Sequence, residues 1–163
     1  MNNDAINLSE QIVRLLHRDW IVEGVLQATA FVLDNNETYL SVNRLSINSF
    51  QSDVAAFLSK HPMYKVIDNG NQYNCAELYV AAVCNISTQF NSQLASLSVE
   101  VEPRNAHIPS HAGIFTRING KNIKGGDNTE YKTDDEKTIS SDVILLKVRM
   151  QLLHLSELKT CAL

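Results

Sequence analysis

Three polar side chains on two apolar segments have the types needed to hold an anion and move a proton. Ser41 and Arg44 lie in the segment YLSVNR, and His111 begins the segment HAGIF. A hydroxyl can donate and accept, a guanidinium can fork onto a carboxylate or phosphate, and an imidazole titrates near neutral pH. We expect any small-molecule or catalytic site where these segments meet. The alternative is that Arg44 forms a surface ion pair and His111 a structural backbone contact.

Two other sets of residues suggest metal or thiol chemistry. His107 and His111 have the spacing H-x3-H, but Pro109 between them predicts a loop, where the helical argument for a metal pair fails. The three cysteines show no C-x2-C spacing. Cys75 could be a nucleophile beside a histidine, yet free cysteine is more often a buried structural residue. We therefore predict no cofactor, with His107 and His111 as the metal candidates that remain.

A third arrangement matches the order of residues in an enzyme that handles nucleotides or NAD. ADP-ribosyltransferase-like folds pair an early arginine or histidine with a strand serine and a late acid on a split antiparallel sheet. His17 or Arg18, then Ser41, then Glu100 occur in that order. This fold-level analogy makes Arg18 and Glu100 ligand-binding candidates.

The composition is that of an ordinary globular protein with a slightly acidic balance. The chain has 163 residues, of which 44% are hydrophobic and 20% charged, and its formal net charge is -4. An acidic chain is not expected to grip a nucleic-acid backbone. No run of about 18 apolar residues predicts a membrane span, and the polar start lacks the layout of a signal peptide. With three irregularly spaced cysteines, the sequence favours the reducing cytoplasm.

Alternating and helical patterns together predict a single α+β domain over residues 1–163. We expect a mostly antiparallel sheet of about five or six strands, packed by about three or four helices. The clearest strand is 97–102, where apolar and polar residues alternate until Pro103, which has no N–H for a ladder. A strand at 111–118 follows a loop at 104–110. It is expected to turn back at Asn119-Gly120, a strong hairpin signal.

The remaining elements are predicted from caps, turn residues and apolar runs. Asn7 with Glu10 three residues later has the pattern of a capping box, so a first helix is expected there. A second helix is expected from about residue 48 until Pro62 stops it. The other predicted elements are strands at 28–33, 39–44, 64–67 and 75–86, a turn at 68–71, and a short helix or loop at 87–96.

The last part of the chain divides into a loop and a long apolar element. Residues 124–137 are Gly-rich and charged, which predicts a mobile loop. Residues 141–159 are predicted to be a helix that Ser140 or Ser141 caps, although part of the segment also alternates like a strand. The helix is apolar almost all round. We therefore expect it to pack on the sheet, a protein partner or a second copy of the chain.

These assignments predict which side chains fill the core. The expected core residues are Leu15, Trp20, Phe31, Leu33, Leu40, Val42, Phe57, Leu58, Val80, Val99, Val101 and Ile114.

The order of four short motifs resembles a group of small uncharacterised bacterial proteins. The motifs are LLHRDWI, ATAFVL, ETYLSVNR and PSHAGIF, and they cover residues 15–115. The group shares an early Trp, an AF strand, an LSV strand and a late P-x-H-A strand, and it carries no activity that could be transferred. The resemblance implies that five recurrent residues belong together: Trp20, Phe31, Ser41, Arg44 and His111.

These observations leave three hypotheses for function. The first is a small cytoplasmic interaction or binding module, working with a partner protein in a bacterial defence or toxin–antitoxin setting. The second is a nucleotide- or NAD-handling enzyme of ADP-ribosyltransferase-like kind. The third is a metal-dependent hydrolase built on His107 and His111.

Overall fold

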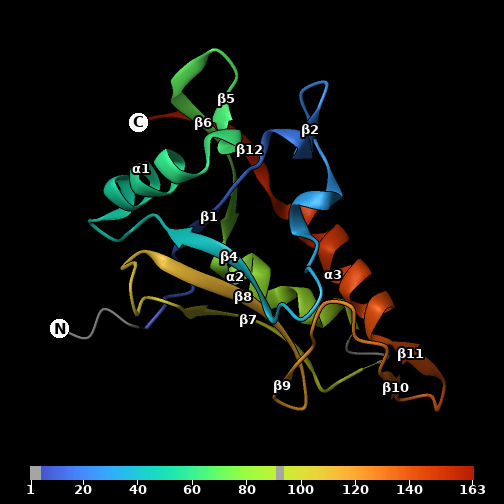
Figure 1. Ribbon diagram of the computed structural model, residues 1–163. Coiled ribbons are helices and arrows are strands. Elements are labelled where there is room, and N and C mark those ends of the chain that lie inside the picture. The colour runs from blue at the N-terminus through green and yellow to red at the C-terminus, as the bar shows by residue number, and fades with distance from the viewer. Residues whose placement is uncertain (1–4, 91–93) are drawn as a thin grey trace.

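One curled antiparallel sheet organises the computed structural model, which describes residues 5–90 and 94–163. Its strand order is β12-β6-β1-β4-β8-β7, and the short strands β5 and β9 add to β6 and β8 (Figure 1). Within the described residues the sheet has eight strands, slightly more than the sequence predicts, and three α-helices pack against it. The α+β class and the antiparallel arrangement are confirmed.

The six main strands are β1 (Gln11–Leu15), β4 (Tyr39–Arg44), β6 (Asn69–Tyr79), β7 (Leu97–Pro103), β8 (His111–Ile118) and β12 (Glu157–Ala162). The short strands are β2 (Ile21–Val22), β3 (Val25–Leu26), β5 (Lys65–Val66), β9 (Lys121–Asn122), β10 (Glu130–Lys132) and β11 (Thr138–Ser140). The α-helices are α1 (Phe50–Lys60), α2 (Val80–Cys84) and α3 (Ser141–Leu155). Four 3-10 helices are described: η1 (Arg18–Trp20), η2 (Ala28–Phe31), η3 (Pro62–Tyr64) and η4 (Asn85–Phe90).

The two faces of the sheet carry different apolar clusters. On one face, residues of β1, β4, β6, β7 and β8 pack against α2, α3 and the 3-10 helices η2 and η4 in the larger cluster. In Figure 1, α2 lies behind β4 and β8. On the other face, α1 packs Val54 and Leu58 against Val13 and Cys75 in a smaller cluster. Helices therefore cover both faces of the sheet, and the apolar cluster is larger on the face of α2 and α3 than on the face of α1.

Strand β4 and the hairpin around β8 form as the sequence predicts. β4, β7 and β8 pair in register, with Ser41 opposite Gly113 and Glu100 opposite Phe115. At the turn between β8 and β9, Asn119 and Gly120 have φ of 51° and 75°, the positive values that this hairpin requires. Most predicted core residues are buried, while Trp20, Leu33, Phe57 and Val101 are half-buried.

The predicted first helix is wrong, because residues 11–15 form the central strand β1. The capping contacts exist: Glu10 accepts from the Asn7 N–H at 2.6 Å, and Asn7 accepts from the Ser9 N–H. They close a turn that leads into a strand. The β-branched pair Ile12 and Val13 is fully buried between β6 and β4, and this pairing outweighs the local helical signal.

Two further predictions fail or succeed only in part. Residues 28–31 form the 3-10 helix η2 instead of a strand, and Ala30 and Phe31 are its buried residues. Residues 75–79 belong to β6, as predicted, but the chain turns into α2 at Val80. The predicted helix or loop at 87–96 contains η4 as far as Phe90, and its residues 91–93 lie outside the described residues.

The C-terminal helix is confirmed, but it ends earlier than predicted. Ser140 caps α3 by accepting a hydrogen bond from the Val143 N–H, and the helix ends at Leu155. Residues 157–162 then form β12, which pairs along β6 and places the Cys161 Sγ 3.5 Å from the Cys75 Sγ. Within 124–137, residues 130–132 form β10, so this segment is part of a hairpin; its mobility stays a prediction.

None of the helices in the described residues combines the length and the apolar character needed to cross a membrane.

Candidate functional site

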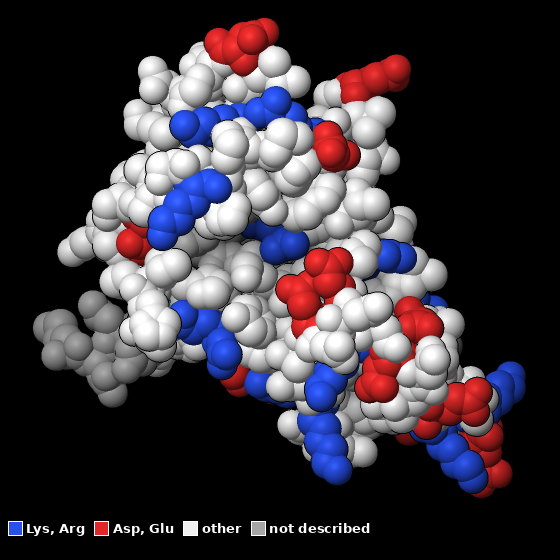
Figure 2. Space-filling model, in the orientation of Figure 1, with Lys and Arg blue, Asp and Glu red and all other residues white. Residues whose placement is uncertain are grey.

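A cavity of about 410 Å³ lies on the α1 side of the sheet, over β4 and the start of β8. Figure 2 shows this view of the molecule hollowed near its centre, with basic and acidic atoms beside the hollow. The lining comes from β1, β4, α1, β8 and the 3-10 helices around η1 to η3. It comprises Arg14, Leu15, Trp20, Thr29, Val32, Asp34, Glu37, Ser41, Asn43, Asp53, Phe57, Tyr64, Ile108 and His111.

Ser41 and His111 meet in this cavity, as the sequence predicts for these two residues. Because β4 and β8 pair with Asn43 opposite His111, Ser41 and His111 point to the same face of the sheet. The Ser41 Oγ lies 3.2 Å from the His111 Nε2, and the serine side is exposed to the cavity. The pair is therefore hydrogen-bonded and open to a ligand.

The environment of His111 favours the neutral imidazole. Burial lowers the pKa of His111, a hydrogen bond with the backbone of Arg104 raises it, and the positive charge of Arg104 lowers it, with a net lowering below the ordinary value. A backbone contact that raises the pKa of a histidine must be a carbonyl that accepts from the ring. Which atom donates between the His111 Nε2 and the Ser41 Oγ depends on the tautomer of the ring, and Nε2 accepts when the proton is on Nδ1.

Arg14 brings a guanidinium into the cavity that the sequence reasoning missed. Its Nε donates to the Ala30 carbonyl at 2.5 Å, and its Nη1 donates to the Ser41 carbonyl at 2.8 Å. The Cζ lies 5.1 Å from the centre of the Trp20 ring, a cation–π distance. Nη2 makes no hydrogen bond within residues 5–90 and 94–163, and Arg14 is one of the residues that line the cavity. The signal in the sequence was an arginine inside the apolar run IVRLL.

Burial lowers the pKa of Arg14, and the negative charges of Glu37 and Asp34 act in the opposite direction. A guanidinium remains protonated at neutral pH even so. Asp34 and Glu37 are exposed residues of the cavity lining, and the Glu37 Oε1 accepts from the Asp34 N–H at 2.7 Å. The cavity thus combines one fixed cation with carboxylates near it.

Asp53 and Asn43 hold the loop that delivers His111. The Asp53 Oδ2 accepts from the Ser110 N–H at 3.0 Å and from the Ser49 hydroxyl at 2.9 Å. The Asn43 side chain donates to the Ser110 Oγ at 2.9 Å. Burial raises the pKa of Asp53, but the hydrogen bonds from Ser110 and Ser49 outweigh it, so the carboxyl is held below its usual pKa. These contacts fix the residue directly before His111.

Aromatic side chains form one wall of the cavity. Trp20, Phe57 and Tyr64 all line it. The Tyr64 ring stands edge-on to both others, with centroid distances of 5.8 Å to Trp20 and 4.9 Å to Phe57. Such packing holds the rings in place and leaves an apolar wall for a flat ligand.

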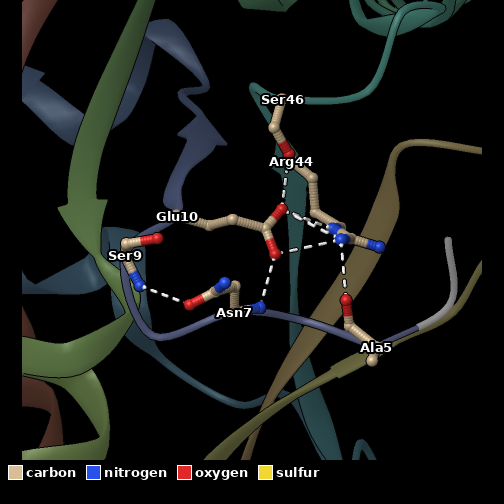
Figure 3. Close-up of polar contacts among 6 residues, drawn as sticks. All are labelled: Ala5, Asn7, Ser9, Glu10, Arg44 and Ser46. Carbon is tan, nitrogen blue, oxygen red and sulfur yellow. Dashed lines mark hydrogen bonds and ion pairs between the residues drawn. The ribbon is translucent and has the colours of Figure 1, made fainter.

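Arg44 does not belong to the site, which corrects the prediction that it joins Ser41 and His111. It is on the opposite face of β4, where it is 4% exposed. Its Nη2 lies 2.9 Å from the Glu10 Oε1, and it also donates to the Ala5 carbonyl (Figure 3). Glu10 in turn accepts from the Ser46 hydroxyl at 2.5 Å. Arg44 therefore ties the segment before β1 to the end of β4.

The other candidates stand apart from the cavity. Arg18 donates to the carbonyls of Pro62 and Met63, and Glu100 pairs with Arg117 on the outer strands. Neither lines the cavity with Ser41, so the order of residues that suggested an ADP-ribosyltransferase-like site does not become a cluster.

His107 is exposed and lines a shallower hollow that also reaches His111. In the part of the chain that the structure describes, no group of at least three His, Cys, Asp or Glu side chains is placed to hold a metal ion. Burial raises the pKa of Cys75, and the neighbouring Cys161 adds to that effect. A thiol in this state is a poor nucleophile.

Comparisons of the chain with protein-family models, curated proteins and solved structures give no match. The geometry of the cavity is therefore the basis on which a function can be inferred.

Proposed function

We propose that the chain is a binding module for a small planar molecule that carries both carbonyl acceptors and N–H donors, of the nucleobase or nucleoside type. The support comes first from Arg14. Its guanidinium is held by two backbone carbonyls and the face of Trp20, its Nη2 makes no hydrogen bond to the described residues, and Arg14 lines the cavity. A fixed donor of this kind suits a carbonyl oxygen of a ligand.

The charge of the lining argues for a neutral ligand over a polyphosphate. Asp34 and Glu37 lie near Arg14, and their negative charges partly offset its positive charge, which weakens the attraction of an anionic ligand. Their carboxylates accept hydrogen bonds, so they suit the N–H groups of a base. The aromatic wall of Trp20, Phe57 and Tyr64 offers apolar and stacking contacts.

A thermal-shift series tests the proposal. Free nucleobases and nucleosides should raise the melting temperature, and NAD or nucleoside triphosphates should do so less at equal concentration. A ligand at about 100 times its Kd adds about 2.7 kcal/mol to the stability of the folded state, which corresponds to about 5–10 °C for a chain of this size. A larger response to the polyanions would favour the nucleotide- or NAD-handling alternative and contradict the proposed ligand.

Three variants locate the binding site. Arg14→Gln and Asp34→Asn should each reduce the response to the ligand. The first removes the guanidinium that donates to a carbonyl of the ligand, and the second removes the carboxylate that accepts from an N–H group of the ligand. Arg149→Gln is the matched control, since Arg149 lies on α3 beside a different cavity. An equal loss of response in Arg149→Gln would place the ligand elsewhere.

The expected partner contact of the C-terminal helix stays a separate prediction. The outer side of α3 exposes Val143, Leu146 and Met150, at 40%, 44% and 48%. Their spacing places them along one stripe of the helix. Light scattering at rising concentration would show association with a second copy, and Leu146→Glu should abolish it.

A further inference from the structure

We propose that Ser41 is a nucleophile that His111 activates as a general base, so that the cavity can accept an acyl or phosphoryl group on the Ser41 Oγ. This activity uses the cavity of the proposed function, but it does not require the ligand named there.

The first support is the geometry of the pair. A serine is a weak nucleophile unless a base within about 2.6–3.2 Å can take its proton. The Ser41 Oγ is 3.2 Å from the His111 Nε2, and both side chains border the cavity. Ser41 lies inside a paired strand and His111 at the start of its neighbour, so the backbone of both is fixed by the ladder.

The second support is the orientation of the imidazole. In the tautomer that carries its proton on Nδ1, the His111 Nε2 accepts from the Ser41 hydroxyl. The Ser110 backbone N–H is bound to Asp53, and the Ser110 hydroxyl accepts from Asn43, so the residue before His111 is held from two elements. A base that is oriented by other groups is the arrangement that serine nucleophiles need.

The third support is a positive charge beside the nucleophile. The Arg14 Nη1 donates to the carbonyl of Ser41 itself, which places the guanidinium next to this residue. Arg14 and Ser41 line the same cavity, and the Arg14 Nη2 makes no hydrogen bond to the described residues, so this donor is available to an oxygen that becomes negative during attack. Fixed donors aimed at a developing oxyanion are a large contribution to such reactions.

The chemistry balances without an external oxidant or reductant. With an ester, the Ser41 Oγ forms a bond to the carbonyl carbon while its proton passes to the His111 Nε2. The ester C–O bond then breaks, and the alcohol leaves with the proton from His111. Water attacks the acyl-serine in the same way, releases the acid and restores Ser41.

An organophosphorus fluoride tests the nucleophile directly. In this reaction the Ser41 Oγ forms a bond to phosphorus, the P–F bond breaks, and the serine proton goes to His111 as fluoride leaves. Peptide mass spectrometry of the treated protein should find the adduct on Ser41. Ser41→Ala should remove it, while Ser59→Ala, at an exposed serine of α1, should not.

The dependence on His111 is the decisive part. His111→Gln should slow labelling of Ser41 by about 100-fold, the lower part of the range for a general base. In the unaltered protein the labelling rate should fall as the pH drops through the pKa of His111. The charged or titratable groups that line the two hollows beside this ring are Arg104 and His107 in the preceding loop, Asp53 on α1, Arg14 on β1, Tyr39 on β4, Tyr64 on η3, and Asp34 and Glu37 at the rim.

No adduct at Ser41, or an adduct that forms equally fast in His111→Gln, would overturn the inference. If the His111→Gln protein fails to fold, the pH dependence of labelling in the unaltered protein takes its place. A labelling rate that stays constant across the midpoint measured by NMR for the His111 ring would then overturn the inference. Labelling without any response to nucleobases would reject the proposed ligand and leave the nucleophile standing.

Discussion

The two faces of the sheet divide stability from chemistry. On the face covered by α2 and α3, β-strand residues such as Ile12, Val42 and Ile114 are buried in a continuous apolar cluster. On the face covered by α1, a smaller cluster leaves room for a cavity lined by Ser41, His111 and carboxylates. One face can therefore hold the fold while the other presents polar groups at a cavity.

The largest expected change in stability comes from truncating a phenylalanine, and it should differ between the two faces. Phe31 is 2% exposed in the larger cluster, so Phe31→Ala should cost about 3–5 kcal/mol of unfolding free energy. Phe57 is half-buried and borders the cavity, so its truncation leaves part of its site already open to water and should cost clearly less. Urea denaturation of both variants measures the difference. Equal losses would mean that the α1 face supports the fold as strongly as the other.

The next effect concerns the ion pair that ties the segment before β1 to β4. Arg44→Met leaves the Glu10 carboxylate without its buried counter-charge and should cost about 3 kcal/mol. Burial raises the pKa of Glu10, but hydrogen bonds from Ser46, Asn7 and Arg44 outweigh it and lower the pKa below 4.5. The stabilisation is thus complete above pH 4.5 and is lost as the pH falls through the folded-state pKa.

Urea denaturation between pH 7 and pH 3 would show this loss. The same series on Glu10→Gln is the control, because that side chain does not titrate. If Glu10→Gln and the unaltered protein lose stability in parallel, the pH effect comes from other carboxyl groups.

A smaller effect should appear in the titration of His111. Burial and the charge of Arg104 place its pKa below 6.5, and NMR of the ring protons would measure the midpoint. Because the folded-state pKa is lowered, the neutral ring is favoured in the folded state. Stability should therefore fall as the pH drops from 6.5 toward the folded-state pKa. Arg104→Gln should move the midpoint upward, and a midpoint at or above 6.5 would contradict the buried setting.

The smallest expected change is that of Ser41→Ala. Its side chain is exposed to the cavity and its hydrogen-bond partner His111 can reach water, so the unfolding free energy should change by less than about 0.5 kcal/mol. Thermal or urea denaturation would show it. A loss above about 2 kcal/mol would make the Ser41–His111 contact a structural one and remove the contrast between the faces.

The predictions that the structure confirms concern features that depend mainly on residues close together in the sequence. Alternation at β7, the positive φ at Asn119-Gly120 and the cap at Ser140 each depend on local sterics or local hydrogen bonds. Ser41 and His111 were also predicted as neighbours, since both lie on segments with clear strand patterns.

The failures came where distant contacts decide the outcome. Residues 11–15 became a strand because β4 and β6 flank them, and residues 28–31 became η2 because Phe31 packs into the larger cluster. Arg44 has the same phase as Leu40 and Val42 along β4, so the alternation itself placed it away from Ser41. Arg14 could not be assigned to the cavity, because its acceptors are carbonyls of η2 and β4.

The central position of β1 also bears on how the chain folds. β1 precedes every other strand in the sequence, yet it pairs with two strands that come much later. Its residue Ile12 lies opposite Arg44 of β4 on one side and opposite Leu78 of β6 on the other. Contacts so far apart along the chain give a high contact order and a large loop-closure entropy, which slow folding to milliseconds or longer. During synthesis β1 would remain unpaired on both edges until β4 and then β6 had emerged from the ribosome.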